Sequence, residues 1–502
     1  MQQIVDLLII GGGINGAGIA ADAAGRGLSV MLCEQGDLAS GTSSASTKLI
    51  HGGLRYLEQY EFRLVAKALK EREVLIKRAP HLIQPLQFIM PHEKHLRPAW
   101  LIRLGLFLYD HLAKRKKIPG SSGLNLRQVF QGKDLQKKFK KGFSYYDCRT
   151  DDSRLVILNA LLARQNGANI LTHTRCLNAK KNKGYWQVLL QDEKTQKQKT
   201  VYAKIIVNAA GPWVMEVLKN ILHQKTDANI KLVQGSHIVV PKLYEGEHAY
   251  ILQNKDRRIA FTIPYHQNFT LIGTTDVLYQ GEPQQAKITK EEKQYLCHII
   301  NHYFKAQITP RDVVWSYVGV RPLYDNYSRN PSKISRDYHF ELNSSDNVTQ
   351  LSIFGGKLTT FRVLAEEVVN KLQPFFPAMK NAWTAEAFLP GGDLQGLSFP
   401  DFVKQLQQKY ARLSQKMIIR FAYSYGSLSY KILGESKSES DLGLYFGAGL
   451  YQREVDYLCK DEWALTAEDI LWRRSKLGLY FSHAQEQKLQ DYLRQRFKAA
   501  EV

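Results

Sequence analysis

The clearest chemical signal in the chain is a glycine-rich stretch near its start, Gly11-Gly12-Gly13-Ile14-Asn15-Gly16-Ala17-Gly18. Its G-x-G-x-x-G spacing suits the pyrophosphate of a dinucleotide. Gly11 permits a tight turn, Gly13 lets a phosphate approach the backbone, and Gly16 lets a helix pack closely against a strand. Free N–H groups and the partial positive charge of a helix N-terminus attract the phosphates. We expect Asn15, in the same turn, to contact the cofactor as well.

The segments around these glycines follow the order strand, turn, helix, strand and acid. Ile4–Ile10 is apolar and β-branched and predicts a strand, Ile19–Ala24 predicts a helix, and Leu28–Cys33 predicts a second strand. Glu34 comes next, where a carboxylate accepts both ribose hydroxyls. The glycine spacing alone also occurs in turns of unrelated α/β proteins. The full order favours dinucleotide binding, without separating NAD from FAD.

Length and charge indicate several domains and an anionic partner. A chain of 502 residues predicts roughly two to four domains. Its 69 Lys and Arg against 47 Asp and Glu give a net charge of +22, which favours nucleic acid, an anionic membrane or a phosphorylated substrate. The lysines are dispersed and no helix-turn-helix, zinc-finger or ribonucleoprotein motif is present, so a nucleic-acid-binding protein is the weaker alternative.

The cysteines and the hydropathy of the chain indicate the cellular compartment in which the protein works. The five cysteines are scattered and form no C-x-x-C pair, which predicts neither a disulfide framework nor a metal site and fits a reducing compartment. The N-terminus enters a strand without a signal peptide, and no apolar run reaches the ~18 residues that a membrane span needs. We therefore expect a protein of the cytoplasm or of a membrane surface.

A Ser-, Thr- and Gly-rich segment over residues 35–60 contains Lys48, His51 and Arg55 at spacings of three and four. A helix or tight turn over Lys48–Leu57 would place these three side chains on one side. Because the segment directly follows the second strand, we expect it to wrap the cofactor rather than to be a solvated connector.

The stretch from Arg97 to Lys117 combines apolar and aromatic residues with a basic cluster at its end. It is too short and too charged to span a bilayer. Such a segment can lie flat on an anionic membrane, and the equally weighted alternative is a buried amphipathic helix with a solvated basic end.

Two later predicted strands also lead into glycine-containing turns. Ile205–Asn208 predicts a buried strand that leads to Gly211, and Leu351–Phe354 predicts another that leads to Gly355 and Gly356. Three glycine-rich strand ends are more than the ADP half of a nicotinamide cofactor needs. They favour an extended FAD that lies along a sheet, with its reactive ring at a second domain.

The expected fold class is α/β: a Rossmann-like FAD-binding domain with an inserted, mainly antiparallel α+β substrate domain and a helical C-terminal domain. Strand candidates crowd residues 230–325, whereas 398–502 shows helical spacing. Leu389–Gly392 reads as a linker. The expected bounds are 1–80, parts of 145–230 and 335–388 for FAD binding, 81–144 and 231–334 for the substrate domain, and 389–502 for the C-terminal domain.

Four motifs together resemble the FAD-dependent glycerol-3-phosphate dehydrogenases, in particular the aerobic, membrane-associated bacterial members. The motifs are the first glycine turn, Ser43–Leu57, Gly319–Leu323 and Phe354–Thr360. The resemblance covers essentially the whole chain, including Asp469–Gly478, where Ser475 stands in place of the family's Thr. It implies oxidation of glycerol 3-phosphate at C2, with electrons passing through FAD to ubiquinone at the cytoplasmic face of the inner membrane. A homodimer is left open.

The resemblance also implies roles for individual residues. Arg55 and Arg321 would hold the phosphate dianion, because a guanidinium offers a bidentate fork. Lys357 would reach the phosphate, a substrate hydroxyl or the flavin carbonyl. His237 is the expected base, with His51 as its rival. Thr274 and Tyr56 would bond the substrate. The expected cofactor contacts beyond the first turn are Glu34, Ser43, Ser44, Lys48, Leu49, His51, Gly211, Gly355, Gly356, Lys357, Leu358 and Thr359.

Within flavoenzymes, the alternatives are a glycerol 3-phosphate oxidase that reduces oxygen and a relative of the amine oxidases. An amino-acid substrate would not need several cations that converge on a phosphate.

Overall fold

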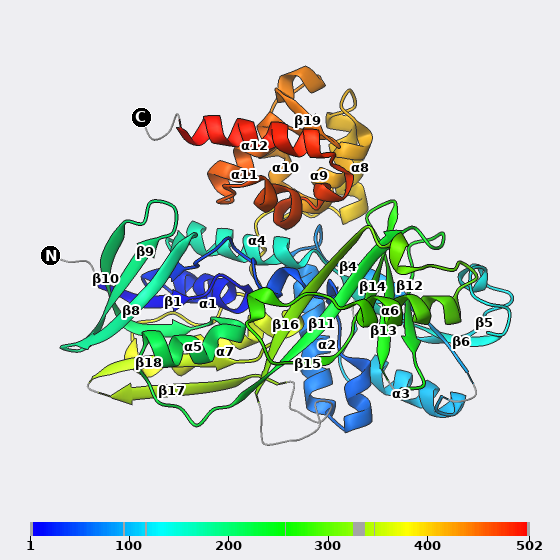
Figure 1. The fold of residues 1–502 in the computed structure, drawn as a ribbon, viewed down its shortest axis with the longest axis horizontal. Coiled ribbons are helices and arrows are strands. Elements are labelled where there is room, and N and C mark those ends of the chain that lie inside the picture. The colour runs from blue at the N-terminus through cyan, green and yellow to red at the C-terminus, as the bar shows by residue number, and fades with distance from the viewer. Residues whose placement is uncertain are drawn as a thin grey trace.

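Two β-sheets lie side by side in the molecule, and a helical domain sits above them in the view of Figure 1. The computed structural model describes residues 4–93, 96–115, 118–256, 258–324, 337–345 and 347–498. The first sheet carries the glycine-rich turn, and the second carries His237. The expected fold class is confirmed.

The first sheet is a parallel core with antiparallel additions. β1 (Ile4–Ile10) pairs in parallel with β2 (Val30–Cys33) and with β10 (Gln198–Asn208). The other strands are β7 (Asn169–Leu171), β8 (Thr174–Asn182), β9 (Tyr185–Asp192), β17 (His339–Ser345) and β18 (Val348–Phe354). Their order is β17-β18-β10-β1-β2-β7, and β8 and β9 extend the sheet from β10. The carboxyl ends of β1, β10 and β18 therefore meet at one edge, where a cofactor binds in such folds.

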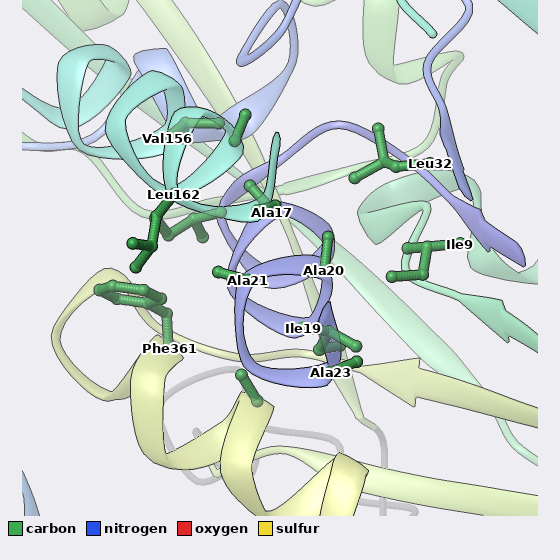
Figure 2. Packing of buried hydrophobic residues seen from close by; sticks show 14 of the residues in the cluster. Ile9, Ala17, Ile19, Ala20, Ala21, Ala23, Leu32, Val156, Leu162 and Phe361 are labelled. Carbon is green, nitrogen blue, oxygen red and sulfur yellow. The ribbon is translucent and has the colours of Figure 1, made fainter. Parts of the chain in front are cut away.

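A helix of small residues packs against this sheet. α1 (Ile14–Gly25) packs against the strands of this sheet. It also contacts α4 (Asp152–Gln165) and α7 (Phe361–Lys371), as Figure 2 shows. A Cβ atom at Gly18 would lie 2.9 Å from the ring of Phe361, so the glycine permits this close approach. The opposite face is covered by α5 (Val214–Glu216) and the β8–β9 hairpin.

The second sheet is mainly antiparallel and centres on β11 (Ile230–Pro241). Its other strands are β3 (Leu49–Ile50), β4 (Gln84–Pro91), β5 (Ser122–Asn125), β6 (Lys141–Arg149), β12 (Ala249–Gln253), β13 (Ile259–Tyr265), β14 (Phe269–Gly273), β15 (Val277–Tyr279) and β16 (Trp315–Tyr324). α6 (Lys290–Tyr303) packs on one face of the sheet. The other face packs on α2 (Phe62–Arg78) and α3 (Ala99–His111).

The C-terminal domain is helical, as expected. It contains α8 (Phe399–Lys409), α9 (Gln415–Tyr425), α10 (Leu428–Leu433), α11 (Gln452–Asp461) and α12 (His483–Lys498), with a short hairpin of β19 (Tyr445–Gly447) and β20 (Leu450–Tyr451). The expected linker is buried between the domains. A Cβ at Gly391 would lie 2.1 Å from the carbonyl oxygen of Tyr425, so this segment is a tightly packed contact.

Some local expectations were wrong or incomplete. Lys48–Leu57 is not one helix or turn, because Leu49–Ile50 forms β3 and a 3-10 helix begins only at Leu54. β5 and β8 were not expected. The numerical domain bounds stay a prediction. β3 lies within residues 1–80 but pairs with β6 in the second sheet. Lys116 and Lys117, in the expected basic cluster, lie outside the described residues.

Candidate active site

A cavity of about 1340 Å³ runs between the two sheets. Its walls come from the β1–α1 turn, the segment after β2, the strands of the second sheet and the β18–α7 turn. The C-terminal domain also contributes Glu468, Trp472 and Arg473. The cavity brings together nearly all of the residues that the sequence predicts for the site.

The first turn has the geometry that the glycine pattern predicts. Gly11 has a φ of +114°, and a Cβ there would lie 2.6 Å from the carbonyl oxygen of Ala209. A Cβ at Gly16 would lie 1.9 Å from the carbonyl oxygen of Gly11. Gly16 does not line the cavity: it permits the helix to approach the strand, while Gly11 and Gly13 line the cavity. Its contact with the cofactor stays a prediction.

Glu34 sits at the end of β2 and lines the cavity. Its carboxylate accepts hydrogen bonds from the backbone N–H groups of Gly12 (2.7 Å) and Gly36 (2.8 Å). Burial raises the pKa of Glu34, and these two hydrogen bonds act in the opposite direction. The amides hold the carboxylate in place where a ribose would bind.

Side chains from distant segments support the same turn. The Ser43 hydroxyl accepts a hydrogen bond from the Ile14 N–H (3.0 Å), and the Asn15 amide donates to the carbonyl of Gly355 (3.2 Å). The Asn15 Oδ1 atom is buried and has no hydrogen-bond partner among the described residues, which leaves an acceptor for a bound group. The turn, the acid and this acceptor fit the ADP half of FAD.

The segment after β2 wraps the cavity, but Lys48 takes a different position from the one expected. Its ammonium group is buried and contacts Asp152 (2.7 Å) and the carbonyl of Ser44 (3.0 Å). Lys48 does not line the cavity, whereas His51 and Arg55 do. The ion pair accounts for this position, because a buried ammonium needs a compensating charge. The contact of Lys48 with the cofactor stays a prediction. His51 is tied to the β18–α7 turn by hydrogen bonds between its backbone and the Thr359 hydroxyl.

Cationic and hydroxyl groups converge beside β11. A Cβ at Gly235 would lie 2.5 Å from Arg321 Nη2 and 2.6 Å from Thr274 Oγ1, so the absent side chain makes room for both groups. Arg321 also lies 3.5 Å from the carboxylate of Asp276. On the same cavity, the Lys357 ammonium lies 4.1 Å from the centre of the Tyr56 ring.

His237 follows Gly235 by two residues on β11, so both face the same side of the sheet. Its Nε2 lies 2.9 Å from the Thr47 hydroxyl, and its ring stacks on Tyr317 with centroids 4.7 Å apart. Burial, with the charges of Arg321 and Lys48, holds the pKa of His237 well below its usual value. The imidazole is therefore neutral near pH 7 and able to accept a proton.

Several wall residues were missed by sequence reasoning. Thr47 lies inside the specific Ser43–Leu57 motif, but its role depends on contact with a strand 190 residues away. Asp276 and Tyr317 lie in no sequence pattern that would mark them as site residues. Arg473 and Arg474 bond Asp37, in the segment after β2, and thereby join the C-terminal domain to the cavity wall.

Comparison with known proteins agrees with this geometry. Residues 6–362 match the family of FAD dependent oxidoreductases, and residues 382–495 match the C-terminal domain of alpha-glycerophosphate oxidase. A glycerol-3-phosphate dehydrogenase of Pseudomonas aeruginosa is 54% identical over 98% of this chain and 96% of the relative. A D-erythritol 1-phosphate dehydrogenase of Brucella abortus is 47% identical over 96% of each chain.

A solved structure carries the same overall fold. The glycerol-3-phosphate dehydrogenase from Bacillus halodurans, complexed with FAD, superposes with a TM-score of 0.76 at 29% identity and covers 99% of this chain and 95% of its own. The glycine turn, Glu34 and the family matches agree on the cofactor. The chain belongs to the FAD-dependent oxidoreductase family and, within it, to the group of the glycerol-3-phosphate dehydrogenases.

Proposed function

We propose that the chain oxidises sn-glycerol 3-phosphate to dihydroxyacetone phosphate, with FAD as its cofactor. The observation that carries this proposal is the spacing on β11. Gly235, which makes room for Arg321 and Thr274, lies one two-residue step from His237, or about 7 Å along the strand. A phosphate-binding cation and a neutral imidazole are thus separated by a distance that a short polyol phosphate spans.

Each residue then has a defined task. Arg321, with Arg55, binds the phosphate dianion, and Lys357 and Tyr56 bond the rest of the substrate. Thr274 donates or accepts a hydrogen bond at a substrate oxygen. FAD, when bound, supplies the acceptor for the hydride that leaves C2. Hydride loss becomes easier as the C2 hydroxyl loses its proton, and His237 is the group that takes up this proton. The residues named for FAD are Gly11, Gly13, Asn15, Glu34, Ser43, Ser44, Leu49, His51, Gly211, Gly355, Gly356, Leu358 and Thr359.

The substrate is tested by anaerobic mixing of the FAD-loaded protein with glycerol 3-phosphate, followed by flavin absorbance. We expect rapid bleaching, and none with glycerol, which lacks the phosphate, or with glycine. Bleaching by glycine alone would contradict the proposal. D-erythritol 1-phosphate is the second candidate, because a relative of 47% identity is named for it. The ratio of kcat/KM for the two phosphate esters decides between them.

We further propose that the electrons pass to ubiquinone, with the protein bound peripherally to the cytoplasmic face of the inner membrane. Support comes from α3, where Trp100, Leu104, Phe107 and Leu108 are all exposed, with exposed fractions between 37% and 69%. Their spacing forms one apolar face, and Arg103 lies beside it. Among the described residues, no helix combines the length and hydropathy of a membrane span.

The electron acceptor is tested after anaerobic reduction with substrate. We expect a short-chain ubiquinone analogue to reoxidise the flavin faster than dissolved oxygen does. Fast formation of hydrogen peroxide with oxygen as the only acceptor would instead identify an oxidase.

A further inference from the structure

His237 stands in the cavity wall but is almost closed off from the cavity itself. Only 1% of its surface is exposed, although it borders the cavity. Thr47 is only partly buried and lines the same cavity. Its hydroxyl oxygen lies 2.9 Å from Nε2 of His237, which is a hydrogen-bond distance. Thr47 therefore lies in the cavity wall at the edge of the ring that carries Nε2.

The ring cannot easily turn toward the cavity. It stacks on Tyr317 with an interplanar angle of 13°, and the Tyr317 hydroxyl donates to the carbonyl of Ser46 (2.8 Å). The strand neighbour on the other side is Gly273, where even a Cβ would lie 2.2 Å from the imidazole. The Tyr317 ring on one side and the backbone of Gly273 on the other therefore fix the orientation of the imidazole.

Hydrogen bonds also hold the chain segment around Thr47. Its chain neighbours Ser46 and Lys48 are both tied to the carboxylate of Asp152, which is itself fully buried. Asp152, the first residue of α4, thus bonds the backbone and hydroxyl of Ser46 on one side of Thr47 and the ammonium of Lys48 on the other. The contact between Thr47 and His237 is built into the wall by two separate sets of hydrogen bonds.

We propose that Thr47 relays the proton of the substrate hydroxyl to His237. The inference rests on the proposed function, in which His237 is the base. The substrate O–H bond breaks and its proton passes to Thr47 Oγ1, while the Thr47 O–H bond breaks and its proton passes to His237 Nε2. The C2–H electron pair leaves as hydride to the FAD of the proposed reaction, and C2 and its oxygen form the carbonyl. Thr47 ends with a proton again, and the imidazole ends with one more.

The electrostatics of the wall suit such a relay. Nε2 has to be an acceptor before the reaction, so the ring proton resides on Nδ1. That atom is buried and forms no hydrogen bond among the described residues. Burial and the nearby positive charges of Arg321 and Lys48 lower the pKa of His237 and keep the ring neutral in the resting state. They also limit how long a positive imidazole persists, which favours return of the proton after the product leaves.

Substitution of Thr47 is the direct test. Thr47→Val preserves the shape of the side chain but removes the hydroxyl, and we expect anaerobic flavin reduction to slow about 100-fold, within the usual range for proton-transfer groups. Thr47→Ser restores the hydroxyl, and we expect it to recover most of the rate. Thr262→Val is the matched control, because the Thr262 hydroxyl is buried on β13, has no hydrogen-bond partner among the described residues and does not line the cavity.

Two further measurements distinguish proton relay through Thr47 from a change in the shape of the site. Flavin reduction in mixtures of H2O and D2O should show a curved dependence on deuterium fraction for the unmodified protein and Thr47→Ser, since two protons move. A linear dependence or none in the unmodified protein would overturn the relay, whatever the variants do. In the substrate-free protein, ¹⁵N NMR should show a shift of the His237 Nε2 signal on Thr47→Val and not on Thr262→Val.

The outcomes separate this inference from the proposed function. Fast flavin reduction in Thr47→Val together with slow flavin reduction in His237→Ala would overturn the relay. His237 would then be a base that contacts the substrate directly. Normal flavin reduction in both variants would remove His237 from the proposed mechanism as well. Slow reduction in both, with recovery in Thr47→Ser, supports the relay.

Discussion

Trp472 of the C-terminal domain stacks on Trp315 of β16, with ring centroids 4.6 Å apart and an interplanar angle of 27°. Trp315 in turn lies 4.9 Å from Tyr317, the ring on which His237 stacks. A column of four rings thus connects the C-terminal domain with the expected base. The helical domain is therefore part of the wall of the active site and not an appendage to it.

Removal of the outer ring should loosen this column. We expect Trp472→Ala to lower the free energy of unfolding by at least about 1 kcal/mol, the size of an aromatic pair, and to slow flavin reduction. Thermal unfolding and stopped-flow absorbance measure the two effects. Trp100→Ala is the control, since 69% of Trp100 is exposed on α3. Equal melting temperatures for the two variants would show that the stack contributes nothing.

Asp37 joins the C-terminal domain to the segment that follows β2. It accepts two hydrogen bonds from Arg474 (2.6 and 2.8 Å) and one from Arg473 (2.6 Å). Asp37→Ala should cost about 3–5 kcal/mol, because it leaves a fully buried guanidinium without its carboxylate. We also expect weaker FAD retention on gel filtration. Glu468→Gln, which removes an exposed partner of the same Arg473, should cost less than about 1 kcal/mol.

Arg321 should control substrate affinity more than cofactor affinity. Arg321→Ala removes charged hydrogen bonds worth about 1.5–3 kcal/mol, so we expect KM for glycerol 3-phosphate to rise about 10- to 150-fold while FAD stays bound. Steady-state kinetics and the flavin spectrum of the purified variant measure both. Arg311→Ala, on an exposed turn, is the control. An unchanged KM in Arg321→Ala would remove this residue from the phosphate site.

The parts of the site that could be predicted are those in which local sequence determines geometry. The glycine turn and Glu34 follow from neighbouring elements, and β1 has the bounds that its apolar run predicts. The ion pair of Lys48 could not be predicted, because its partner Asp152 is an acid that lies more than 100 residues away. Thr47 escaped notice for the same reason, since its partner His237 lies 190 residues away. Long-range pairing of polar groups leaves no periodicity in the chain.

Stability should fall in acid because of His81. Burial and the charge of Arg154 lower the pKa of His81 to about 3. Below its unfolded value of about 6.5, the unfolded chain binds a proton that the folded chain does not, so stability is present above that pH and is lost as the pH falls toward 3. The loss approaches about 1.4 kcal/mol per pH unit.

Urea unfolding at pH 7 and pH 5 measures this effect. We expect His81→Gln to reduce the difference between the two conditions, while His111→Gln, at an exposed position of α3, leaves it unchanged. An identical pH dependence in the unmodified protein and His81→Gln would assign the acid sensitivity to other groups.

Membrane binding should depend on the exposed face of α3. Trp100→Asp with Phe107→Asp replaces two exposed rings by charges that an anionic bilayer repels, so we expect binding to vesicles of anionic phospholipid to weaken more than about tenfold. Vesicle sedimentation measures this. Phe130→Asp, an equally exposed ring outside α3, is the matched control. Full retention in the double variant, or an equal loss in Phe130→Asp, would mean that a different surface meets the membrane, because only a face that is buried in the bilayer loses its apolar contribution when its rings are replaced.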